Sequence, residues 1–125
     1  MKKNIAIVII AISITSFTGC YYDKEVVAPP GSATCDTTQM SYTGDIVNIF
    51  NNNGCFGCHT GPSGNGGVNL NNHSGAGTVA NDGRLLQAIT WTGPQRTHMP
   101  QGGPKLTACE IGKIRAWVKE GAKNN

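Results

Sequence analysis

The sequence has few aromatic residues for its length. Among 125 residues there are three Phe, three Tyr and two Trp, whereas glycine occurs 17 times. A small domain with so few large apolar side chains has difficulty building a stable core from side chains alone. We therefore expect the core of the folded chain to contain something in addition to side chains.

Charge of either sign is also scarce. The chain has 10 basic and 7 acidic residues, and Lys2 and Lys3 belong to a charged start that contains no acid. From residue 20 onward, eight basic residues therefore face seven acidic ones, a difference of only +1. This near balance gives no argument for nucleic acid or an anionic surface as a partner.

Residues 1–19 have the layout of a secretory signal peptide. A positive start is followed by an apolar run over 5–14 that is too short for a comfortable membrane span. An uncleaved anchor helix is the alternative. The ending "SFTGC" resembles the lipobox of bacterial lipoproteins, and this resemblance implies that Cys20 is lipidated and begins the mature chain.

Both interpretations export the chain, to the periplasm or the cell exterior, where disulfides persist. Residues 20–34 contain charges followed by Pro29, Pro30 and Gly31, which predicts a flexible tether. The remaining residues, 35–125, have the length of one folded domain.

We expect an all-α fold, because helical patterns occur and no strands alternate with them. Apolar residues at helical spacing predict a first helix over about 43–53. A second is predicted over about 83–91, with Asp82 as its N-cap. Between them, the stretch 61–82 is so rich in Gly and Asn that we expect no long regular element there.

The strongest helix prediction is the last one, over about 107–121. Thr107 followed by Glu110 forms a capping-box pattern, and an apolar stripe that includes Trp117 follows it. Gly121 is a suitable C-terminal stop. Trp117 is therefore expected in the core.

The segment "CFGCH" places Cys55, Cys58 and His59 in the pattern C-x-x-C-H, the attachment motif of c-type haem. Two thiols three residues apart lie on one face of a helical turn, where both can bond to one porphyrin edge. The adjacent histidine can then bind the iron. A zinc site needs a second ligand pair, and a redox dithiol needs a βαβ context, and the sequence contains neither.

A six-coordinate haem usually takes methionine or a second histidine as its other axial ligand. Met99 lies in "THMPQGGPK", a turn-rich loop stiffened by proline, and is the favoured candidate. His98 and His73 are the alternatives, as is an iron with an open site. Met40 is expected to be a core residue.

Several stretches together resemble one family. "CFGCH", "GGVNL" and "MPQGGPKLTACEIGKIRAWVKEGA" are similar to the small c-type cytochrome domains of bacterial lipoproteins. The resemblance implies a small cytochrome-c-like helical bundle around one covalent haem c, with the distal ligand at Met99. It further implies a carrier of single electrons between redox partner proteins, held to a membrane by a lipid at Cys20, and not an enzyme.

Two other classes of protein stay open. One is a haem protein with an open or bis-histidine iron, such as a peroxidase-like protein or a gas sensor. The other is a structural lipoprotein without haem. In every case Cys35 and Cys109 are left as an even pair in an exported chain, which predicts a disulfide closing a loop of about 75 residues. Two unpaired thiols are the alternative.

Overall fold

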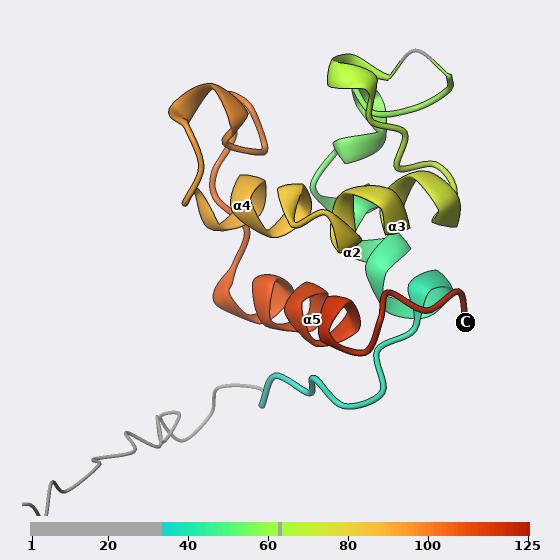
Figure 1. Ribbon diagram of the computed structural model, residues 1–125. Helices are drawn as coiled ribbons and strands as arrows, with labels where there is room; N and C mark the ends of the chain where they lie inside the picture. The colour runs from blue at the N-terminus through green and yellow to red at the C-terminus, as the bar shows by residue number, and fades with distance from the viewer. Residues whose placement is uncertain (1–33, 63) are drawn as a thin grey trace, which may run out of the picture. The chain divides into compact units, whose positions relative to one another are not determined.

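The computed structural model describes residues 34–62 and 64–125 (Figure 1). The predicted signal peptide, the lipidated Cys20 and the tether up to residue 33 lie outside the described residues. Within the described ranges every regular element is a helix and there is no strand, so the all-α prediction is confirmed there. None of these described helices is long and apolar enough to cross a membrane.

The first predicted helix is present in two joined pieces. A π-helical turn, η1 (Tyr42–Ile46), continues directly into α2 (Val47–Asn52). The hydroxyl of Ser41 accepts a hydrogen bond from the amide of Gly44 and caps the start. Ile46 and Phe50 are almost completely buried, as the helical spacing predicted.

Helix α3 (His73–Asn81) corrects the prediction that 61–82 contains no long regular element. The side chain of Asn72 caps it by accepting from the Gly75 amide at 2.8 Å. At Gly75 a Cβ would lie 1.9 Å from the carbonyl oxygen of Asn69, so only glycine permits this approach. Small residues therefore allow the helix to pack closely, whereas in the sequence they favour the prediction of an irregular loop.

Helix α4 (Arg84–Thr90) lies within the predicted range, but its predicted N-cap is wrong. Gly83, in the left-handed region at φ 83°, occupies the N-cap position. Asp82 instead accepts from the Arg84 amide at 2.9 Å and forms an ion pair with the Arg84 side chain at 2.8 Å. The helix ends at Trp91, which also has left-handed backbone angles.

Helix α5 (Ala108–Lys119) begins with the predicted capping box, in which Thr107 and Glu110 bond to each other's main chain. Glu110 also accepts a hydrogen bond from the Asn53 side chain at 2.9 Å. Burial alone would raise the pKa of Glu110, but these hydrogen bonds from Asn53 and Thr107 outweigh it and lower the pKa. The carboxylate thus joins the start of α5 to the end of α2.

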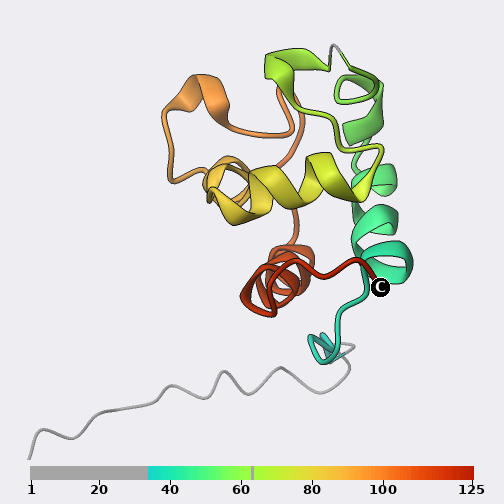
Figure 2. The same cartoon turned by 45° about the vertical axis from the view of Figure 1, so that its right-hand side comes forward.

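In the described part of the chain, the core lies where α2, α3, α4 and α5 meet. Trp117 of α5 is fully buried, which confirms its predicted core position, and Met40 is only 4% exposed. Trp117 stacks on Tyr42, and the Tyr42 amide donates a hydrogen bond to the side-chain oxygen of Asn125 at 3.0 Å. In Figures 1 and 2, the loops over 54–62, 64–69 and 92–102 lie on the side of α3 and α4 that faces away from α5.

Candidate functional site

The two thiols of the C-x-x-C-H segment lie in a single tight turn. Gly54, at φ 68°, ends the preceding helix and begins the 3-10 helix η2 (Cys55–Gly57). The carbonyl of Cys55 accepts from the amides of Cys58 at 3.3 Å and His59 at 3.0 Å. Residues three apart in such a turn eclipse one another. Cys55 and Cys58 are both free thiols. Both sulfurs must be free if they are to bond to one and the same group.

Cys55 has the environment of a thiol and not that of a thiolate. Its side chain is half-buried and packs against the core. Burial raises the pKa of the Cys55 thiol, and the neighbouring Cys58 and Glu110 raise it further. A redox-active cysteine acts as a thiolate and needs a lowered pKa, so the environment of Cys55 does not favour a redox dithiol.

His59 is held by its main chain, while its ring lacks a partner. The amide of Leu70 donates to the His59 carbonyl at 2.8 Å. The ring nitrogen Nδ1 is buried and has no hydrogen-bond partner among the described residues. Buried polar atoms are almost always paired, so an unpaired one calls for an explanation. A group bound by this imidazole is one such explanation, because a neutral histidine is a common metal ligand.

The donor set fits haem better than it fits a bare metal ion. Over residues 34–62 and 64–125, no three His, Cys, Asp or Glu side chains converge on a point that could hold a metal ion. A structural zinc needs four such protein ligands. In haem, the porphyrin supplies four nitrogen ligands to the iron. The protein then needs to supply only axial ligands and, in c-type haem, two thiols. Cys55, Cys58 and His59 meet that smaller requirement.

Two hydrogen bonds hold the main chain of Met99, one at its amide and one at its carbonyl. Its amide donates to the carbonyl of Ala88 in α4 at 3.1 Å. Its own carbonyl accepts from the indole Nε1 of Trp91 at 2.9 Å. The side chain is half-buried, just after the short 3-10 helix η4 (Gln95–Thr97). The loop therefore presents Met99 from a restrained backbone.

Both alternative histidines already bond to main-chain carbonyls. His98 stacks on Trp91, with ring centres 5.3 Å apart and planes 2° from parallel, and its Nε2 lies 2.9 Å from the Gly93 carbonyl oxygen. Nε2 of His73 lies 2.7 Å from the carbonyl oxygen of Ala122. Either histidine would have to give up its bond before it could bind iron through this nitrogen.

His73 is also the first residue of α3 and packs edge-on against Tyr42, with ring centres 5.0 Å apart. His73 therefore lies in a helix and packs against the core, and is not part of a loop.

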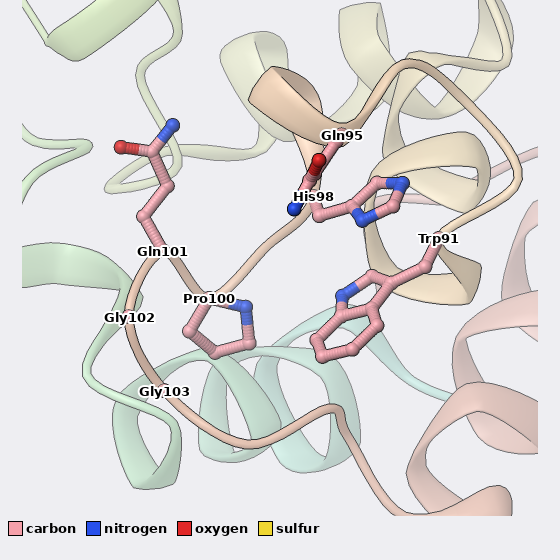
Figure 3. A pocket seen from close by; sticks show the side chains of 7 residues that line it. All are labelled: Trp91, Gln95, His98, Pro100, Gln101, Gly102 and Gly103. Atoms are coloured by element: carbon pink, nitrogen blue, oxygen red, sulfur yellow. The ribbon is translucent and has the colours of Figure 1, made fainter.

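The loop over 92–105, which carries Met99, is called the Met99 loop below. An open hollow of about 370 Å³ lies beside it (Figure 3). Its lining residues come from one segment of the chain: Trp91, Gln95, His98, Pro100, Gln101, Gly102 and Gly103. Trp91 belongs to this site although the sequence analysis did not single it out. The available signal was a tryptophan directly after the last turn of a helix, close in sequence to the candidate ligand.

Cys35 and Cys109 are joined by a disulfide, the pairing that the sequence analysis predicted. The S–S distance is 1.99 Å and the two Cα atoms are 5.5 Å apart. Cys109 lies in the first turn of α5, which follows the Met99 loop along the chain. The bridge therefore anchors the beginning of the described chain at the element that ends this loop.

Comparisons with protein-family models, with curated proteins and with solved structures return no match to this chain. Its function is accordingly inferred from its own residues: two thiols and a histidine in one turn, and a methionine on a restrained loop.

Proposed function

We propose that this chain is an extracytoplasmic monohaem c-type cytochrome that transfers single electrons. Cys55 and Cys58 would form the two thioether bonds, and His59 and Met99 would be the axial ligands of the iron. One observation above all supports this assignment: two free thiols and a histidine lie in one tight turn, in which the Cys55 carbonyl accepts from the amides of Cys58 and His59.

Haem c, when bound, would supply a reversible one-electron iron couple. The protein's part is to hold the ligands and to exclude water. The Leu70 amide fixes the main chain of His59, and the carbonyl of Ala88 fixes that of Met99. Phe56 and Val68 pack against the core beside the motif and limit the access of water. A site held in this way changes little when charge changes, which suits an electron carrier.

The cellular setting is inferred from the N-terminal sequence. Lipidation at Cys20 would hold the protein at a membrane, facing the periplasm or the cell exterior, and residues 20–34 would act as the tether. Redox partner proteins would meet the domain in brief contacts of the small kind typical of electron transfer. We propose a carrier and not an enzyme, because no catalytic group accompanies the haem motif in the sequence.

Covalent haem is tested with the exported protein produced in cells that mature c-type cytochromes. We expect a pyridine haemochrome spectrum of haem attached through two thioethers, and loss of covalent haem in the variant with Cys55→Ser and Cys58→Ser. The matched control carries Cys35→Ser and Cys109→Ser, which removes two cysteines outside the motif and should keep the haem. A wild-type protein exported without covalent haem would falsify the proposal.

The distal ligand is tested by exchanging methionines. Met99→Leu should abolish the weak far-red band of sulfur-to-iron charge transfer in the ferric protein and lower the reduction potential. Met40→Leu is the control, because Met40 is buried in the core and the exchange conserves volume. If the band survives Met99→Leu, another sulfur binds the iron and Met99 is not the ligand. A bis-histidine or high-spin spectrum in the wild type would instead favour the alternatives with His98, His73 or an open site.

A further inference from the structure

Trp91 has an unusual position for a large apolar residue. It is 38% exposed, and no other large hydrophobic side chain of the described residues is classed as exposed. Its backbone lies in the left-handed region, at φ 60° and ψ 35°. A bulky residue in this region is an outlier and persists only where its surroundings hold it there. Neither burial nor backbone preference explains a tryptophan at the end of α4.

The Trp91 side chain makes three contacts with the loop that carries Met99. The indole Nε1 donates to the Met99 carbonyl at 2.9 Å, and the ring stacks on His98. The ammonium of Lys105 lies 5.8 Å from the ring centre, within the range of a cation–π contact. One side chain at the start of the loop therefore touches two residues in its middle and one at its end.

We propose that Trp91 is the positioning residue for the distal ligand. This inference rests on the proposed function, in which Met99 binds the iron. The indole N–H holds the Met99 carbonyl while the Ala88 carbonyl holds the Met99 amide, so the residue is fixed from both sides. Only the side chain of Met99 is left to adjust. A ligand fixed in this way loses less conformational freedom when it binds, so the bond to iron opens less often.

His98 supports Trp91 and is not itself the ligand. Its Nε2 lies at hydrogen-bond distance from the Gly93 carbonyl, and its ring is parallel to the indole, as Figure 3 shows. The imidazole thereby restrains the indole from one face. The same contacts engage the nitrogen that His98 would need for iron, which explains how a histidine can neighbour Met99 without competing with it.

The test is the variant Trp91→Phe in the haem-loaded protein. Phenylalanine keeps an aromatic ring against His98 but lacks the N–H that bonds to Met99. Imidazole is added to the ferric protein, and loss of the sulfur-to-iron band measures its binding. Because imidazole binds only when Met99 has left the iron, its apparent Kd falls in proportion as the open fraction rises. We expect a decrease of about fivefold, which corresponds to ~1 kcal/mol, the net value of one hydrogen bond.

Trp117→Phe is the matched control. Trp117 also donates its indole N–H to a main-chain carbonyl at 2.9 Å, that of Lys123, but it lies in the core between α5 and η1. This exchange should lower global stability and leave the apparent Kd for imidazole within about twofold, because it removes no hydrogen bond from the Met99 loop. As a second measurement, exchange of the Met99 amide hydrogen should be faster in Trp91→Phe than in the wild type.

The outcomes separate this inference from the proposed function. If the wild type has the sulfur-to-iron band and Trp91→Phe changes neither imidazole binding nor amide exchange, Trp91 does not position Met99 and the cytochrome assignment stands. If Trp117→Phe changes imidazole binding as much as Trp91→Phe does, the effect is one of general stability and the inference is wrong. If the wild type lacks the band, the assigned Met99 ligation and this inference are both wrong.

Discussion

Removal of the Cys35–Cys109 disulfide should cost the domain a large part of its stability. The two residues are 74 positions apart, so the bridge closes a loop of about 75 residues in the unfolded chain. Loop-closure entropy for that length gives about 4 kcal/mol. Residues 34–39 are all exposed, so without the bridge this short segment would also gain freedom in the folded state. We therefore expect a loss of about 2–4 kcal/mol in the free energy of unfolding.

The assay is urea denaturation of the haem-loaded domain, followed by far-ultraviolet circular dichroism, for the wild type and the variant with Cys35→Ser and Cys109→Ser. With the iron of both proteins already in the ferrous state, treatment of the wild type with a disulfide reductant should reproduce the loss, and the same treatment should leave the variant unchanged. That control separates the cross-link from the effect of the serine side chains. A loss below ~1 kcal/mol in both comparisons would refute the loop-closure reasoning.

Two further predictions concern the helices. Gly75→Ala would place a Cβ 1.9 Å from the Asn69 carbonyl oxygen and should destabilise the domain by at least ~2 kcal/mol. Gly112→Ala, in the interior of α5 with only an ordinary contact at 3.5 Å, should instead stabilise it by ~0.5–1 kcal/mol in the same denaturation assay. The lowered pKa of Glu110 means that its contribution is complete above its ordinary value of 4.5 and is lost as the pH falls below it. Glu110→Gln should therefore give a shallower fall in unfolding free energy on acidification, and equal slopes for both proteins would contradict the assignment.

Helix α5 was predictable because all of its signals are local. The bonds between Thr107 and Glu110 join residues three apart, and the apolar stripe ending at Trp117 has helical period. Helix α3 was missed because its stability depends on a contact that sequence spacing does not encode. Gly75 has poor helix propensity, and its benefit appears only when the carbonyl of Asn69 is brought against it.

The candidate site also has one part that the sequence could predict and one part that it could not. Cys55, Cys58 and His59 lie within one short motif, and the hypothesis of haem attachment can be formed from their spacing alone. The part played by Trp91 could not, because its hydrogen bond to Met99 depends on how the loop turns back after α4. A tryptophan placed eight residues before a methionine forms no recognised pattern, and only the folded loop brings the two together.

The close approach of Gly75 to Asn69 also limits how the sequence can change over generations. The residue after Asn69 is Leu70, whose amide holds the carbonyl of His59. A side chain at position 75 would displace residues 69 and 70, and with them the anchor of the histidine. Natural descendants of this gene should therefore retain glycine at 75, or replace it only together with changes at 69 and 70. Exposed neighbouring positions such as Asn71 should tolerate substitution by many other residues.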